Sequence, residues 1–295
     1  MTSIMTYSSK SRQVRRKAIN TIMLTLMGVA AVIVVAPLIW ILVYVIRAGL
    51  PAINSAFFTQ LPTPVGVPGG GIINALVGSL ITVGSGALIA APIGVLAGIY
   101  AATNPNTPFG LCIRFGTDVI SGVPSIVMGI FAYSLVVLPQ RHFSALSGGI
   151  VLSFIMVPII IRTTEEMIKL VPKSLREGSL ALGAAEWKTS ASVILPAALN
   201  GVLTGLMLAI ARAAGEAAPM LFTAFGNPFM NTDINQPIAT LPHTIFVYAI
   251  APYQDWHDKA WGTALVLITL VLLLNIMARL IVWWRVRRLG SVVRN

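Results

Sequence analysis

The sequence predicts an all-α membrane protein, a helical bundle with six membrane-spanning helices. Of its 295 residues, 56% are hydrophobic and only 10% are charged, whereas a soluble domain carries about a quarter charged residues. Six apolar segments are also long enough to cross the hydrocarbon core, which takes about 20 residues in a helix. Composition and segment length together place most of the chain in a lipid bilayer.

Hydropathy divides the chain into spans and loops. The expected spans lie near residues 19–46, 72–102, 114–138, 148–170, 194–223 and 261–284. We therefore expect one transmembrane domain over 19–284, with a basic tail at 1–18 and another at 285–295. Prolines and glycines inside several spans indicate close helix packing or a bundle that flexes during transport.

The charge distribution predicts the sidedness of the chain. The formal net charge is +11, and ten of the twenty Lys and Arg residues lie near the two ends of the sequence. Residues 169–193 are also basic, whereas the loop 224–260 carries three aspartates against one lysine. By the positive-inside rule, both termini and 169–193 face the cytoplasm and 224–260 faces outside. Because no nucleic-acid-binding fold accompanies the charge, we expect membrane lipids and no nucleic acid as contacts.

The residue types needed for catalysis or metal binding are sparse. There is one cysteine, and His142, His243 and His257 are scattered through expected loops without metal-ligand spacing. No G-x-x-x-x-G-K-[ST] phosphate loop occurs, so the chain is not expected to hydrolyse ATP itself. We expect no catalytic residue, no metal site and no cofactor bound by this chain.

The loop after the fourth span is predicted to form two short helices. Ser174 followed by Glu177 has the spacing of a capping box at a helix start, and Gly183 interrupts the helical pattern. Leu195 with Pro196 is expected to begin the next span. A surface of small residues around a glycine allows the backbone of a second protein to approach closely. An ordinary amphipathic interfacial loop is the alternative.

Two spans contain ionisable residues, which cost roughly 2.5–3.5 kcal/mol each at a helix centre on insertion scales. Arg162 and Glu166 lie in the fourth span, and Arg212 and Glu216 lie in the fifth. Residues four apart share a helix face, so each pair is expected to be an intrahelical ion pair. Such pairs serve either to accommodate charge in a bundle or to form an anion site.

Arginine suits an anion site because its planar fork matches a phosphate edge. Thr163 adds a hydroxyl donor, and a nearby glutamate holds the empty arginine until the anion exchanges with it. At about 1.5 Å per residue, Arg162 lies roughly 12 Å and Arg212 roughly 24 Å from the expected cytoplasmic surface. The two arginines therefore act in succession, or together if the fifth helix extends into the cytoplasm. Arg114 with Asp118 is a further pair of the same spacing, expected to anchor the third span.

The predicted cytoplasmic loop, residues 171–196, resembles the docking loop of ABC importer permeases. That loop reads E-A-A, three residues, G, nine residues, then I-x-L-P, and here the matching positions are Glu177, Gly178, Ser179, Gly183, Val193, Leu195 and Pro196. The two alanines and the isoleucine are replaced by residues of similar size or hydrophobicity. The resemblance implies the type I ABC importer permease fold, with coupling helices in this loop that fit a groove on a cytoplasmic ATPase.

Three further segments resemble the PstA family of bacterial phosphate importer permeases. They read IRTTEEMIKLVP at 161–172, LAIARAAGEAAPMLFTA at 208–224 and NQPIATLPHTIF at 235–246. The resemblance implies phosphate transport across the bacterial inner membrane by alternating access, with Arg162, Arg212 and Glu216 on the path.

The same resemblance implies a set of partners. They are a paralogous permease, PstC, a homodimeric ATPase, PstB, which holds the ATP and Mg, and a periplasmic phosphate-binding protein, PstS. Two other functions stay open on the residues alone. One keeps the architecture and imports another oxyanion, such as molybdate, sulfate or a phosphonate, and the other is a secondary transporter or channel.

Overall fold

The computed structural model describes residues 10–292 of the chain, with side chains for residues 12–280. The chain divides into two units, Met1–Ala48 and Gly49–Asn295. The described part of the first unit belongs to helix α1 (Lys10–Gly49), which carries one internal proline and whose last residue is the first of the second unit. This helix contains the expected first span and also the described part of the expected N-terminal tail, whose residues 1–9 lie outside the description.

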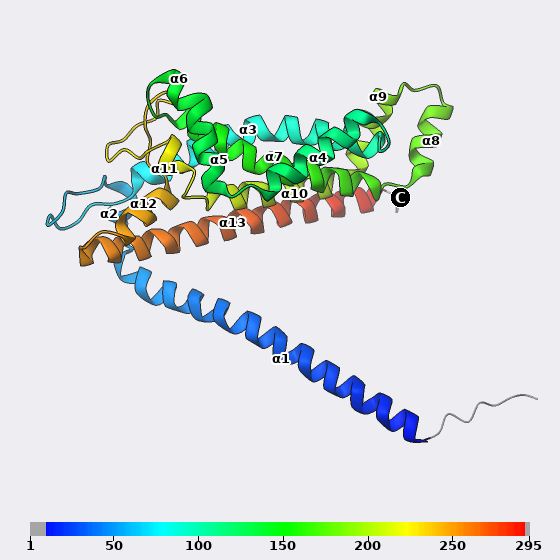
Figure 1. Ribbon diagram of the computed structural model, residues 1–295, viewed down its shortest axis with the longest axis horizontal. Helices are drawn as coiled ribbons and strands as arrows, with labels where there is room; N and C mark the ends of the chain where they lie inside the picture. Colours follow the sequence, from blue (N-terminus) through cyan, green and yellow to red (C-terminus); the bar gives the residue numbers. More distant parts are fainter. Residues whose placement is uncertain (1–9, 293–295) are drawn as a thin grey trace, which may run out of the picture. The chain divides into compact units, whose positions relative to one another are not determined.

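The second unit is a bundle of four long helices with shorter helices at both ends. The long helices are α3 (Ile73–Thr103), α7 (Ala145–Lys169), α10 (Leu195–Ala214) and α13 (Gln254–Val292). Helix α7 packs between α3 and α10, and α13 packs on α10 (Figure 1). The shorter elements are η1 (Leu50–Ala52), α2 (Ser55–Thr59), α4 (Pro108–Gly122), α5 (Ser125–Ala132), the π-helical η2 (Tyr133–Val137), α6 (Leu138–Gln140), α8 (Lys173–Ala181), α9 (Glu186–Thr189), the π-helical η3 (Ser190–Ile194), α11 (Met220–Thr223) and α12 (Leu241–Ala249).

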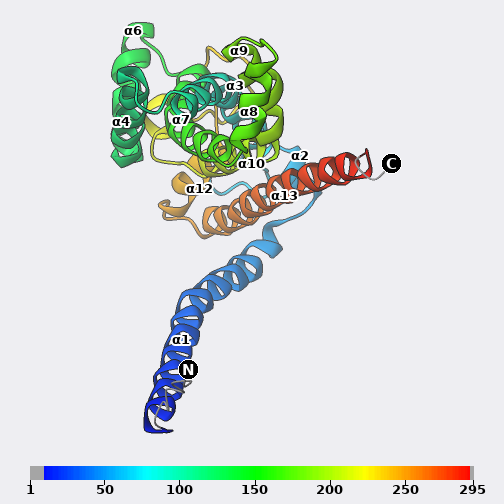
Figure 2. The same cartoon turned by 90° about the vertical axis from the view of Figure 1, so that its right-hand side faces the viewer.

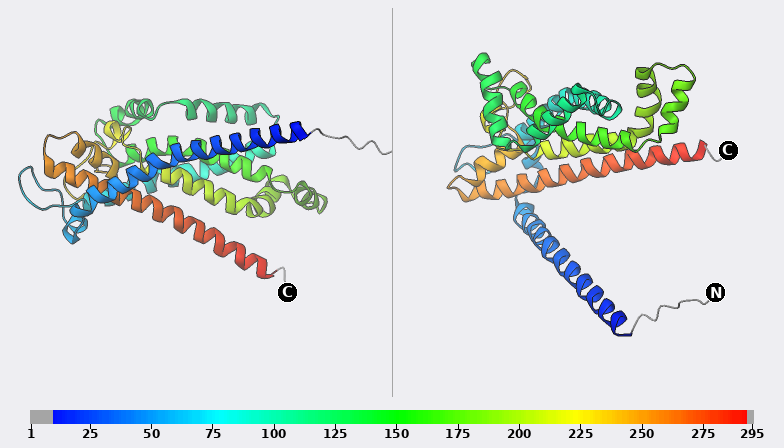
Figure 3. Two further views of the ribbon diagram at one scale, coloured as in Figure 1. Left: turned by 90° about the horizontal axis from the view of Figure 1, so that it is seen from below. Right: turned by 45° about the vertical axis from the view of Figure 1, so that its right-hand side comes forward.

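The two ends of the second unit differ. Helices α8 and α9 project from one end of the bundle, and α11 and α12 lie at the other, as Figures 1 and 3 show. Seen along the bundle in Figure 2, α4 flanks α7 on the side away from α13. These are the α8–α9 end and the α12 end of the bundle.

The structure has five helices long and apolar enough to cross a membrane among its described residues. They confirm the expected first, second, fourth, fifth and sixth spans, with shifted ends: the fifth ends at Ala214 rather than near residue 223, and the sixth helix begins at Gln254. Gly215 caps the fifth helix, and a proline four residues later prevents the backbone from continuing regularly. The protein is thus a multi-pass helical membrane protein.

The expected continuous third span at 114–138 is wrong. Helix α4 and the run from α5 to α6 meet at an angle of 106°. Val123 at the break is extended (φ −79°, ψ 129°), because Pro124 disfavours the helical conformation of the residue before it. Only as a bent pair do these helices supply a sixth crossing.

Glycines on α3 allow it to pack closely on α7. A Cβ atom on Gly94 would come within 2.7 Å of Ile160, and one on Gly98 within 2.6 Å of the Thr164 side chain. Small residues are typical of such helix interfaces in membranes. Residue numbers rise together along both helices at these contacts, so α3 and α7 run parallel.

Helices α7 and α10 also meet through glycines. The side chain of Met167 packs on Gly201, and that of Thr163 packs on Gly205. Residue numbers rise on one helix as they fall on the other, so α7 and α10 run antiparallel. These two contacts fix the register between α7 and α10, with Thr163 level with Gly205.

The loop between α7 and α10 confirms one sequence prediction and corrects two. Gly183 has φ +81°, a conformation that favours glycine, and it separates α8 from α9 as expected. The capping box is wrong: α8 begins after Pro172 without a side-chain cap, which leaves Ser174 inside the first turn. The expected helix start at Leu195 is also wrong, because α9, η3 and α10 form one run from Glu186 to Ala214.

Candidate functional site

A buried carboxylate organises the α8–α9 end of the bundle. Glu165 on α7 is 1% exposed, and its Oε1 accepts hydrogen bonds from Arg114 Nε at 2.7 Å and Lys169 Nζ at 2.6 Å. Arg114 on α4 also donates to the carbonyl oxygens of Ala101 at 2.6 Å and Pro105 at 2.7 Å. One glutamate and one arginine thereby join the end of α3, the following turn, α4 and α7.

Arg162 forms an ion pair with Asp118 on α4. Its Nη1 also lies 4.0 Å from Glu165 Oε2. The expected pairs Arg162–Glu166 and Arg114–Asp118 are therefore both wrong. Each charged residue of α4 pairs with α7 instead, because α4 and α7 cross with these side chains facing each other. Glu166 is exposed and makes no ion pair among the side chains described.

The faces of α7 explain this arrangement. Residues advance by about 100° per position around an α-helix. Ile160 faces α3, Thr163 faces α10, and Arg162 faces α4. The sector of α7 between its α4 and α10 contacts carries Glu166 and the edge of Arg162, whose side chain is 41% exposed. Thr163 donates to the Ile159 carbonyl at 2.9 Å, so its hydroxyl is engaged within the helix.

The second arginine pair forms as the sequence predicts, although Glu216 lies just beyond the end of α10 and not within the helix. Arg212 Nη2 lies 3.4 Å from Glu216 Oε1, and the side chains are 62% and 15% exposed. Arg212 is seven residues from Gly205, so both occupy the face of α10 directed at α7.

The register fixes how far apart the two arginines lie along the bundle. Thr163 packs on Gly205, so Arg212 is six residues closer to the α12 end than Arg162, about 9 Å along the axis. No ion pair among the described side chains joins the two groups. The structure places Arg162 with Asp118 and Arg212 with Glu216, at two different levels.

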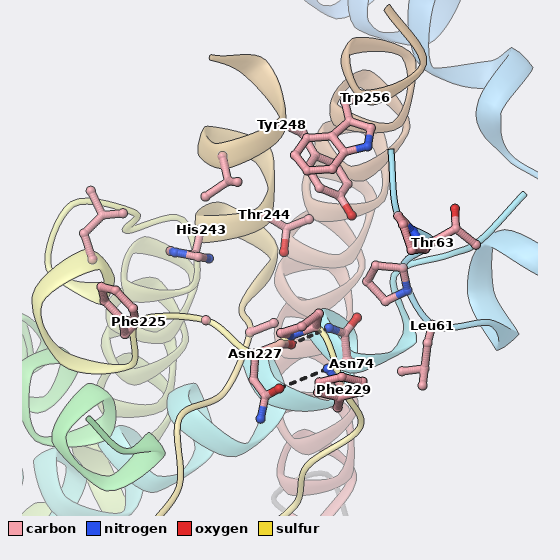
Figure 4. A pocket seen from close by; sticks show the side chains of 17 residues that line it. Leu61, Thr63, Asn74, Phe225, Asn227, Phe229, His243, Thr244, Tyr248 and Trp256 are labelled. Atoms are coloured by element: carbon pink, nitrogen blue, oxygen red, sulfur yellow. Dashed lines mark hydrogen bonds between the residues drawn. The ribbon is translucent and has the colours of Figure 1, made fainter. Parts of the chain in front are cut away.

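The α12 end contains a cavity of about 810 Å³. Figure 4 shows it between α12, the chain near Leu61 and Thr63, and the loop at 225–229. None of its 17 lining residues is charged. Asn74 at its base donates to the Asn227 carbonyl at 2.7 Å. An uncharged, largely apolar wall does not suit a multiply charged anion, so the arginine pairs remain the anion candidates.

Polar contacts tie α8 to α9 across Gly183. The hydroxyl oxygens of Ser179 and Thr189 share a hydrogen bond of 2.9 Å, and Arg176 Nη2 lies 3.4 Å from Glu186 Oε1. A Cβ atom on Gly178 or Gly183 would meet nothing within 4 Å, so both glycines lie on an open surface.

The same surface carries two large apolar side chains that the sequence prediction missed. Leu182 is 91% exposed and Trp187 is 75% exposed. Their position on either side of Gly183 is visible in the sequence. Large apolar residues beside a glycine in a charged loop are the signal that identifies them.

The sequence prediction also omitted Glu165, Arg114, Asp118 and Lys169 from the candidate site. Glu165 followed by Lys169 has the favourable i, i+4 order of a helical ion pair, which was a usable signal. The contribution of α4 carried no local signal, since residues 114 and 165 are brought together only by the fold.

Comparison with known proteins gives the family. Residues 94–290 match the family described as binding-protein-dependent transport system inner membrane component. A phosphate transport system permease protein PstA of Yersinia pestis is 42% identical over 275 residues, which cover 93% of each chain. The chain belongs to the PstA family. The Haemophilus influenzae PstA is 44% identical over 90% of this chain and 94% of its own. A PstA of Mycobacterium tuberculosis is 34% identical over 93% of this chain and 91% of its own.

Solved structures support the fold. An inward-facing MetNI methionine ABC transporter aligns with a TM-score of 0.57 at 19% identity, over 72% of this chain and 93% of that chain. The expected fold of a type I ABC importer permease is confirmed for this PstA-family member, and its homologues are transport permeases.

Proposed function

We propose that this chain is the membrane-spanning permease subunit of an ATP-driven phosphate importer. Support comes from PstA relatives aligned over nine-tenths of the chain, whose name is that of a phosphate transport permease. The fold is that of ABC importer permeases. The chain itself performs no catalysis; it provides part of a route through which phosphate crosses.

The observation that carries this proposal is the exposure of ion pairs on membrane helices. Arg162 and Asp118 are 41% and 59% exposed, and Arg212 is 62% exposed. Charge facing hydrocarbon is costly, so these groups face a water-filled route or another subunit. The guanidinium fork pairs with phosphate oxygens in the same way as with a carboxylate.

The register between α7 and α10 supports two positions for phosphate along the route. Phosphate pairs with Arg212, beside Glu216, near the α12 end, and with Arg162 about 9 Å nearer the α8–α9 end. Glu166 lies on the same sector of α7 as Arg162, and its charge repels an anion that strays from the arginine. Thr163 packs against α10 and does not donate to phosphate, because its hydroxyl donates a hydrogen bond to a backbone carbonyl of its own helix.

The ABC importer fold supports a set of partner subunits. Helices α8 and α9 dock on the cytoplasmic ATPase, which binds the ATP and Mg, through the surface around Gly183. A paralogous permease of the PstC type completes the route, and a periplasmic phosphate-binding protein of the PstS type delivers phosphate at the α12 end. Both termini then lie in the cytoplasm of a bacterium, in agreement with their positive charge.

Uptake of labelled phosphate into vesicles containing the full importer tests the proposal. Arg212→Lys keeps the charge and removes the fork, and we expect uptake to fall by about tenfold or more. Arg141→Lys is the control, since Arg141 lies exposed in a loop at the α12 end. Unchanged uptake with Arg212→Lys refutes the role of that fork. Stronger competition by sulfate or molybdate than by unlabelled phosphate refutes the cargo.

A further inference from the structure

Two ion pairs join α4 to α7, and their environments differ sharply. Arg114–Glu165 is a buried pair, with side chains 20% and 1% exposed and two further hydrogen bonds from the arginine to backbone carbonyls. Arg162–Asp118 is an open pair, with side chains 41% and 59% exposed. The buried pair holds the helices together whether or not the open pair is formed. The open pair is therefore free to exchange.

We propose that Asp118 is a tethered competitor of the transported anion, occupying Arg162 until phosphate displaces it. This inference rests on the proposed function, in which phosphate pairs with Arg162. Carboxylate and phosphate oxygens bind the same edge of a guanidinium group. Asp118 already takes the hydrogen bond from Nη2 of Arg162, so an arriving anion must replace it.

Glu165 makes this exchange possible without loss of the arginine's position. Its Oε2 is buried, has no hydrogen-bond partner among the described side chains, and lies 4.0 Å from Nη1 of Arg162. When Asp118 leaves, the buried carboxylate still attracts the guanidinium from behind. The arginine then presents its outer edge to the anion and does not swing away.

The tethered carboxylate also gives selectivity. An anion gains access to Arg162 only if it pairs with a guanidinium more strongly than the aspartate does. Inorganic phosphate, which carries between one and two negative charges at neutral pH and has several acceptor oxygens, meets this condition. A weakly pairing monoanion such as nitrate does not. Asp118 thereby excludes abundant simple anions from a site that a free arginine would open to them.

Equilibrium binding of labelled phosphate to the purified complex of permeases and ATPase, without the binding protein, tests this role. With Asp118→Asn, we expect half-saturation at a phosphate concentration about two- to fivefold lower, the range set by removal of one exposed ion pair. Nitrate is expected to compete with phosphate in this variant and not in the parent.

Glu166→Gln is the matched control, because it removes the same charge one helical turn from Arg162 on the exposed sector of α7 without breaking an ion pair. A smaller fall in the half-saturating phosphate concentration for Glu166→Gln than for Asp118→Asn supports direct competition, because Glu166 only repels the anion whereas Asp118 occupies the arginine. Equal gains in both variants, or no gain in Asp118→Asn, overturn it. If Asp118→Asn does not assemble, Asp118→Ser is measured with the same expectations.

Arg162→Gln separates this inference from the function on which it rests. Weak phosphate binding in Arg162→Gln, with no further change on adding Asp118→Asn, supports the direct pairing. Weak binding in Arg162→Gln with no effect of Asp118→Asn alone overturns the competitor role and leaves the importer function standing. Undiminished binding in Arg162→Gln overturns the phosphate role of Arg162 and the competitor role with it.

Discussion

Replacement of Glu165 by alanine tests the buried cluster that joins α3, α4 and α7. The side chain is 1% exposed and accepts from Arg114 at 2.7 Å and Lys169 at 2.6 Å. Lys169 is 53% exposed and turns to solvent at little cost. Arg114 is only 20% exposed, so the loss leaves a largely buried positive charge with two carbonyl contacts and no counter-ion.

Removal of one partner from a buried ion pair typically costs 3–5 kcal/mol. We expect the lower end, about 3 kcal/mol, because the two carbonyl oxygens still bind Arg114. A loss of this size corresponds to a thermal midpoint lower by about 6–12 °C in a domain of this size. The measurement is thermal unfolding of the purified importer in detergent, followed by a reporter on α4.

Glu166→Ala provides the comparison within the same helical turn. It removes the same charge and side chain from an exposed position without an ion pair, and we expect a change within about 0.5 kcal/mol. Equal midpoints for the two variants would refute the reasoning, since burial and pairing are what distinguish Glu165 from its neighbour.

Two further outcomes are expected at the two ends of the bundle. Gly183→Val places a β-branched residue at φ +81° on the open surface between α8 and α9, so co-purification with the ATPase should be lost while membrane insertion is retained. Gly178→Ala adds a Cβ atom that has no other atom within 4 Å, so it should leave co-purification normal. Normal ATPase recovery with Gly183→Val would exclude docking at the surface around Gly183. At the α12 end, burial lowers the pKa of His243 below its ordinary value of about 6.5. The unfolded state then binds more protons, so stability is full above about pH 6.5 and falls as the pH decreases through and below that value. His243→Gln should remove this part of the pH dependence, and an unchanged profile between about pH 8 and about pH 5.5 would refute it.

Hydropathy predicted most of the fold because membrane insertion is a local property of about 20 consecutive residues. The helices α3, α7, α10 and α13 lie where apolar segments were found. Gly183 separates α8 from α9, as the interruption of the helical pattern predicted. The prediction failed at Pro124, because a window of hydropathy does not register a backbone bend of 106°. It failed again at Leu195, where a helix continues through a sequence that resembles a helix start.

The sequence by itself determined the class of protein, five of its spans, and the Arg212–Glu216 pair, whose partners lie four residues apart at the end of α10. Only the tertiary structure decided the partners of Arg162 and Arg114. Both have a carboxylate four residues later, yet each pairs across to another helix. Helical spacing determines which side chains share a face, but the rotation of each helix against its neighbours determines which faces meet. That rotation depends on glycine contacts such as those of Gly98 and Gly205, which link residues far apart in the chain.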